Sequence, residues 1–185
     1  FCAKPLEFVS KTNLKTNYEF ICEFVDPVRE FIASKSHSDK AQRLLYNGSQ
    51  TAGNIFSDSD AGIRKIEERI RSEINEYRLK FEESSEGLIS RWPKNYEIYG
   101  WLIRMRDGGF LKPHIHERGW LSGSIYIRVP SKLKPGEGNL ILCLDDNNHM
   151  DSVDTNIERK INVVSADLCL FPSSLFHYTT PFSAR

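Results

Sequence analysis

The clearest hydrophobic pattern in the chain predicts a long amphipathic helix over about residues 59–82. Arg, Lys and Glu residues occupy one side of this segment, and the Ser and Asp residues at 57–60 are suitable N-caps. The apolar side chains recur every three or four residues, which is the spacing of one helical face. These side chains are Ile63, Ile66, Ile70, Ile74, Tyr77 and Phe81. We expect this face to pack against a sheet and the charged face to meet solvent.

Two shorter segments precede this helix. Residues 16–33 carry an apolar stripe with Pro27 inside it, and this proline either begins a new helix in its first turn or breaks the helix before it. Residues 44–56 are predicted to form short extended pieces around glycine-containing turns. We therefore expect residues 1–94 to be a mainly helical lead-in that supports the rest of the chain.

From about residue 96 onward, the pattern changes to short apolar runs separated by turn residues, which is typical of strands. The expected turns are Asp107-Gly108-Gly109, Pro135-Gly136 and Pro172-Ser173. The expected strands are residues 96–106, 112–117, 121–129, 138–144, 161–164, 167–171 and 174–179. Many short strands at regular spacing favour a sandwich or a barrel.

The predicted fold class is α+β with a mainly β core, in a single domain over residues 1–185. The simplest architecture is a jelly roll (double-stranded β-helix) in residues 95–185, backed by the N-terminal helices. The sequence does not begin with Met and ends soon after a predicted strand, so we expect a longer parent chain and a missing final strand. The Asn/Asp-rich segment 145–158 is predicted to be an exposed loop that could act as a lid.

Composition narrows the class of protein further. The 25 basic and 25 acidic side chains cancel, so there is no electrostatic signature of binding to nucleic acid or to an anionic membrane. No apolar run approaches the roughly 18–20 residues that span a bilayer. The four cysteines lack CxxC spacing, and Cys143 and Cys169 lie in apolar runs, so we expect buried, reduced thiols and a cytoplasmic setting.

Histidines carry the most specific chemical signal in the chain. His114 and His116 form a His-x-His pair, and side chains two residues apart on a strand point the same way. His177 follows in another strand–turn–strand segment and can supply a third ligand to the same metal ion. Three protein ligands would leave open positions for a substrate. The alternative is that the pair marks a polar strand edge and that His177 is a surface residue near a turn.

The surrounding motifs resemble a known family. The blocks GWLIRMRDGGFLKPHIHERGWLSGSIYIRVP and GNLILCL…LCLFPSSLFHYTTPF are similar to those of the 2-oxoglutarate/Fe(II)-dependent oxygenases often found behind tetratricopeptide repeats in bacteria and phage. These enzymes are distant relatives of prolyl and aspartyl hydroxylases. The resemblance covers residues 95–185 well and the helical half more loosely. The combination of HIH, WLSGSIY and FPSSLFH makes it fairly specific, whereas HxH alone would be a weak signal.

The resemblance implies an Fe(II) site in which His114 is the first ligand and His177 the distal one. His116 stands where the wider superfamily has a carboxylate, so the third position is filled by His116, by Glu117 or by water. The far carboxylate of 2-oxoglutarate needs a cation, and the candidates are Arg185, after the distal histidine, and Arg104. Hydroxyls of Ser122 and Tyr126 are further candidates for lining the pocket.

The predicted function is that of an oxidoreductase, a dioxygenase and hydroxylase that couples oxidative decarboxylation of 2-oxoglutarate to oxidation of a substrate. Its partners would be O₂ and an unknown substrate, with a peptide or protein as one possibility. One alternative is a cupin-like metalloenzyme that uses a three-His site without 2-oxoglutarate. The other is a jelly-roll binding module without turnover. The sequence leaves the oligomeric state open.

Overall fold

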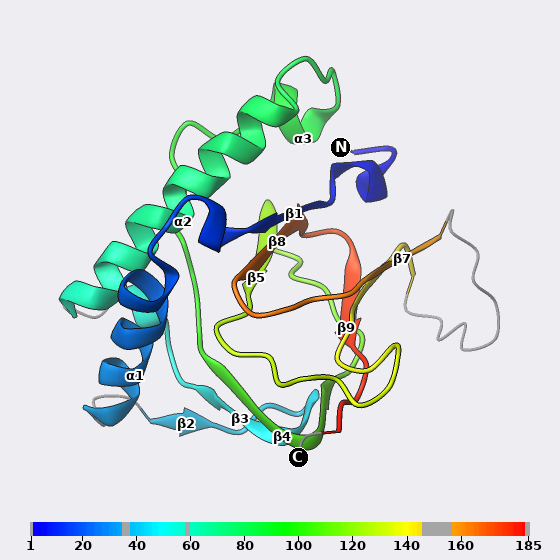
Figure 1. Cartoon of the computed structure of the whole chain (residues 1–185). Helices are drawn as coiled ribbons and strands as arrows, with labels where there is room; N and C mark the ends of the chain where they lie inside the picture. The colour runs from blue at the N-terminus through cyan, green and yellow to red at the C-terminus, as the bar shows by residue number, and fades with distance from the viewer. Residues whose placement is uncertain (1, 35–37, 58–59, 146–156, 184–185) are drawn as a thin grey trace.

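The computed structural model describes residues 2–34, 38–57, 60–145 and 157–183 (Figure 1). The helices are α1 (Asp26–Ala33), α2 (Ala61–Lys80) and α3 (Gly87–Ser90), with single helical turns at Pro5–Phe8, Leu14–Thr16, Ile21–Val25 and Ile55–Ser57. The strands are β1 (Ser10–Asn13), β2 (Asp39–Lys40), β3 (Leu45–Thr51), β4 (Ile103–Leu111), β5 (Leu121–Ile125), β6 (Leu140–Cys143), β7 (Glu158–Ile161), β8 (Asp167–Pro172) and β9 (Phe176–Thr179). No described helix is both long enough and apolar enough to cross a membrane.

The strands form three antiparallel sheets of three strands each, in the orders β1-β8-β5, β2-β3-β4 and β7-β6-β9. Figure 1 shows α1 and α2 on one side of the molecule and the sheet β7-β6-β9 on the other, with β1-β8-β5 between them. The fold is therefore a mixed α+β arrangement in which strands predominate in the second half of the chain.

Strand β8 explains how these layers are held together. All six of its residues are buried, and its side chains alternate between the two faces of the sheet. Leu168 and Leu170 belong to the core that includes the helices, whereas Cys169 and Phe171 belong to a second core with Leu142 of β6. The middle sheet thus packs against the helices on one face and against β7-β6-β9 on the other.

The long amphipathic helix is confirmed as α2. The side chain of Asp60 caps it by accepting a hydrogen bond from the Ile63 amide at 2.8 Å. Ile63, Ile66 and Tyr77 are buried in the helix-side core, as their spacing predicts. Pro27 lies in the first turn of α1, so it begins a helix, although the preceding turn at Ile21–Val25 runs directly into it.

The predicted turn at Asp107-Gly108-Gly109 is wrong. Strand β4 begins at Ile103, later than expected, and continues through these residues to Leu111. The register against β3 shifts at this point, so the extra residues form an irregular bulge and do not end the strand. Gly108 has φ +72°, a conformation that glycine adopts without steric cost, and its amide donates to the Phe182 carbonyl at 2.8 Å.

Other predicted boundaries also change. The expected strand 112–117 is reduced to an isolated bridge at His114, and β7 lies three residues before the predicted 161–164. The N-terminal segment, which was predicted to be mainly helical, also contains strand β1. This strand pairs with β8 across more than 150 residues of sequence. The predicted lid over 145–158 falls almost entirely on residues 146–156, which lie outside the described residues.

Candidate metal centre

The backbone brings His114 and His177 together. The two residues form an antiparallel bridge in which the His114 amide donates to the His177 carbonyl at 3.1 Å and the His177 amide donates back at 2.9 Å. His177 lies on β9, opposite Leu142 of β6, so pairing with a buried strand fixes its position. The two imidazole rings are 4.1 Å apart, centre to centre. The predicted pairing of a His-x-His segment with a distant strand is therefore present in the structure.

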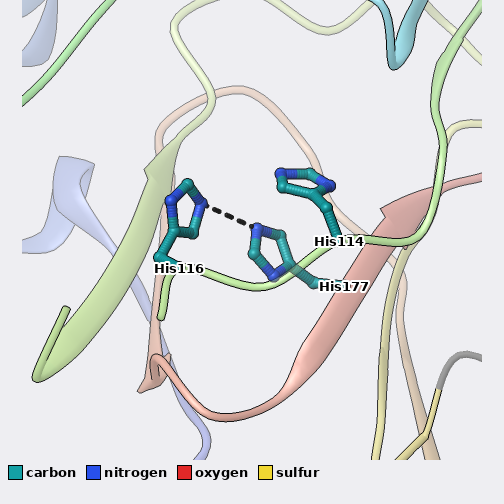
Figure 2. Close-up of side chains that lie close together, drawn as sticks. All are labelled: His114, His116 and His177. Carbon is teal, nitrogen blue, oxygen red and sulfur yellow. Dashed lines mark hydrogen bonds between the residues drawn. The ribbon is translucent and has the colours of Figure 1, made fainter. Parts of the chain in front are cut away.

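His116 reaches the same point from the following loop. Its amide donates to the Ser173 carbonyl at 3.4 Å, and its carbonyl accepts from the Gly119 amide at 2.8 Å. A Cβ atom at Gly119 would lie 2.5 Å from Oγ of the buried Ser173, so the loop can pass this close only with glycine at that position. The result is that Nε2 of His116 lies 3.2 Å from Nε2 of His177 (Figure 2).

Backbone carbonyls orient two of the three rings. Nδ1 of His114 lies 2.8 Å from the Lys112 carbonyl, and Nδ1 of His177 lies 3.3 Å from the Leu175 carbonyl. A carbonyl can only accept, so each Nδ1 carries the hydrogen, and each Nε2 is left with a free lone pair. In both cases the acceptor is two residues before the histidine. Both rings are therefore held in the tautomer that a metal ion requires at Nε2.

Burial lowers the pKa of two of the three histidines. His177 is 7% exposed, while His114 and His116 are partly buried. Burial lowers the pKa of His177 to about 3, with a smaller contribution from the neighbouring imidazoles, and burial followed by the charge of His114 lowers the pKa of His116. The ring of Phe171 packs against the His177 ring, with 5.0 Å between ring centres. The ring of Trp101 packs against the His116 ring, with 5.5 Å between ring centres. Burial therefore favours the neutral forms of His116 and His177, which are the forms that bind a metal ion.

The spacing of the nitrogens fits one metal ion. One ligand atom from each of the three histidines can be chosen so that all lie within 4.8 Å of one another. Two imidazoles bound at about 2.0–2.1 Å in tetrahedral or octahedral geometry have nitrogens about 2.8–3.4 Å apart, and the observed 3.2 Å falls in that range. Within the part of the chain that the structure describes, no carboxylate joins this group, and Glu117 is exposed.

The two predicted cosubstrate arginines lie elsewhere. Nη2 of Arg104, on β4, donates to both carboxylate oxygens of Asp39 at 2.7 and 2.8 Å, and both side chains are about 44% exposed. Arg185 lies outside the described residues. The structure therefore brings the three predicted histidines together and leaves Arg104 paired with another strand.

The two candidate hydroxyls take different positions. Ser122 Oγ lies 2.7 Å from Ser173 Oγ, so it supports the loop that carries His116. Tyr126 packs against the core between the two sheets, and burial raises the pKa of its hydroxyl well above the usual range. Sequence reasoning missed the Lys112 and Leu175 carbonyls, because any residue can supply a backbone acceptor and only the chain path decides which one does.

Comparisons with known proteins agree with this geometry. Residues 99–185 match the family described as "Putative 2OG-Fe(II) oxygenase". No curated protein matches the sequence at a significant level.

Two solved structures share the fold. A prolyl hydroxylase from Trichoplax adhaerens, in complex with a hypoxia inducible factor oxygen degradation domain peptide fragment, has a TM-score of 0.61 and 16% identity, covering 98% of this chain and 80% of its own. A prolyl-4-hydroxylase from Pseudomonas putida has a TM-score of 0.59 and 12% identity, covering 95% of this chain and 86% of its own. Residues 99–185 are thus similar to the "Putative 2OG-Fe(II) oxygenase" family, and the chain has a prolyl hydroxylase-like fold.

Proposed function

We propose that the protein is an Fe(II)- and 2-oxoglutarate-dependent dioxygenase that acts as a hydroxylase. The observation that carries this proposal is the cluster of His114, His116 and His177, whose nitrogens lie close together inside the family-matching region. Without a metal ion, Nε2–H of His116 can donate to Nε2 of His177, and a bound metal ion would take the place of this hydrogen between the two nitrogens.

In this proposal, the three histidines hold the iron, and the chain supplies orientation and a sheltered site. The Lys112 and Leu175 carbonyls keep two rings in the required tautomer. Phe171 and Trp101 limit the access of water to the rings. Bound iron and 2-oxoglutarate would supply the oxidising power, with succinate and CO₂ as the products of cosubstrate decarboxylation.

The cation for the far carboxylate of 2-oxoglutarate is proposed to be Arg185, with Arg104 as the second candidate. A guanidinium group suits this role because it binds a carboxylate through two parallel hydrogen bonds. Arg104 donates from Nη2 to both carboxylate oxygens of Asp39, and it would have to give up this partner to serve the cosubstrate.

We also propose that residues 1–185 form one domain with a jelly-roll core. Two arguments support this architecture: the inner faces of β1-β8-β5 and β7-β6-β9 pack against one core cluster, and β1 connects the N-terminal segment to β8. A peptide or protein is the proposed substrate class. Its support is by analogy, since one structure with the same fold holds a peptide fragment.

The direct test is succinate formation from 2-oxoglutarate by protein loaded with Fe(II) without oxygen and then exposed to O₂. We expect slow turnover without substrate that His177→Ala abolishes and Glu117→Ala leaves unchanged. Bound iron without succinate formation would contradict this proposal. Such a result would favour a three-His enzyme that does not use 2-oxoglutarate, which the all-imidazole cluster also fits, or a binding module.

A further inference from the structure

The candidate metal centre is unusual in charge. Its three ligands are neutral imidazoles, and among residues 2–34, 38–57, 60–145 and 157–183 no carboxylate completes a ligand group with them. A divalent ion held by two histidines and one carboxylate has a net charge of about +1, whereas one held by His114, His116 and His177 retains about +2. The following inference rests on the proposed metal site.

The two aromatic side chains that pack against the histidine rings carry no charge that would offset this additional charge. Phe171 and Trp101 pack against the rings, and His177 is buried. The nearest acidic residue in sequence, Glu117, is exposed, and the Lys112 ammonium lies over the Tyr46 ring at 4.9 Å from its centre. Solvent screens charges in such a partly buried site less than in bulk water. The absence of one negative charge about 4 Å from a bound anion therefore strengthens the attraction between that anion and the metal centre.

We propose that His116 increases the affinity of the metal centre for anions. With His116 as a ligand, the bound metal ion binds small anions and carboxylates at its open positions more tightly than it would with an aspartate at position 116. A second consequence concerns the metal. Imidazole suits iron, cobalt, nickel and zinc, whereas carboxylate oxygens suit manganese and magnesium, so an all-imidazole site discriminates against Mn²⁺.

The test replaces His116 by two side chains of the same shape that differ in charge. His116→Asp introduces a carboxylate, and His116→Asn introduces the neutral isostere. Each protein is loaded with Co²⁺, whose visible absorption reports changes in ligation, and is titrated with azide. His116→Glu supplies the same negative charge on a longer side chain if the aspartate variant does not fold.

We expect the wild type and His116→Asn to bind azide at least about fivefold more tightly than His116→Asp. We also expect His116→Asp to raise the affinity for Mn²⁺ relative to Co²⁺ by about tenfold. Equal azide affinity in the aspartate and asparagine variants would overturn the inference while leaving the metal site intact. Absence of Co²⁺ binding by the wild type would overturn the proposed metal centre and this inference together. Absence of 2-oxoglutarate turnover alone would leave the anion result standing.

Discussion

Two polar clusters lie at opposite ends of strand β8, and they differ in how their polar atoms are paired. At the start of the strand, the buried carboxylate of Asp167 accepts hydrogen bonds from Asn13 Nδ2 at 2.9 Å, from the Val164 amide at 3.0 Å and from Lys11 Nζ at 3.3 Å. About 20 Å further along, just past the end of the strand, Ser173 supports the loop that carries His116.

The difference distinguishes a structural cluster from a candidate site. Every donor around Asp167 faces an acceptor, so the cluster is complete and holds β1 against β8. In the histidine cluster, backbone carbonyls occupy Nδ1 of His114 and His177, and the Nε2 atoms of His116 and His177 face each other at 3.2 Å. In the metal-free protein, Nε2–H of His116 can donate to Nε2 of His177, and a metal ion can replace this hydrogen by binding both nitrogens.

The largest expected effect is the loss of metal binding in His114→Ala. Loss of a hydrogen bond that supports a metal ligand typically lowers metal affinity tenfold to hundredfold. Removal of a ligand itself should lower the affinity for Fe²⁺ or Co²⁺ by more than that. Titration calorimetry without oxygen measures this change. The free energy of unfolding of the apoprotein should change little, because the His114 ring is only partly buried. Glu117→Ala is the matched control, and tight binding by His114→Ala would rule out this ligand set.

The converse change is Asp167→Ala, which should destabilise the fold and leave the metal affinity of the folded protein unchanged. The Val164 amide and the Asn13 amide group lose their acceptor, which costs about 2–4 kcal/mol in the free energy of unfolding. Urea denaturation of the apoprotein measures this quantity. If Asp167→Ala lowered metal affinity as strongly as His114→Ala, the two clusters would not be functionally separate.

A smaller effect is expected from pH on the apoprotein. The pKa of His177 falls from its ordinary 6.5 to about 3 in the folded state, so between these values the unfolded chain binds more protons. The free energy of unfolding should therefore fall as pH drops from 6.5 toward 3, by up to about 1.4 kcal/mol per pH unit from this group. The difference between wild type and His177→Asn isolates this contribution from that of the carboxylates. If the difference in the free energy of unfolding between wild type and His177→Asn did not vary with pH, burial would not lower the pKa of His177 as described.

The smallest effect is expected for Arg104→Gln. Its pair with Asp39 is about 44% exposed on both sides, and such pairs contribute about 0.2–1 kcal/mol to stability. If Arg185 binds the cosubstrate, Arg104→Gln should leave the KM for 2-oxoglutarate unchanged. An increase in that KM of tenfold or more would instead identify Arg104 as the cosubstrate-binding residue.

The sequence predicted those features that depend on periodicity. The apolar stripe of α2 follows directly from side-chain spacing, and the apolar run at 167–171 predicted strand β8. The His-x-His pair and His177 were predicted from residue type and strand context, and the structure places them together.

Features that depend on long-range pairing could not be predicted. Strand β1 is only four residues long, and the polar sequence SKTN becomes a strand because β8 offers it a free edge. The Asp107-Gly108-Gly109 segment reads as a turn, yet the backbone hydrogen bond from Gly108 to Phe182 keeps it inside a bulged strand. The role of Gly119 also depends on the distant Ser173, which local sequence does not reveal.

The most direct test of the central claim is a crystal structure of the protein grown with Fe²⁺ or Co²⁺ under anaerobic conditions, with anomalous scattering to locate the metal. The account predicts one ion within about 2.0–2.2 Å of a ring nitrogen from each of His114, His116 and His177. An ion bound elsewhere, or bound by Glu117 with His116 turned away, would contradict the three-histidine centre.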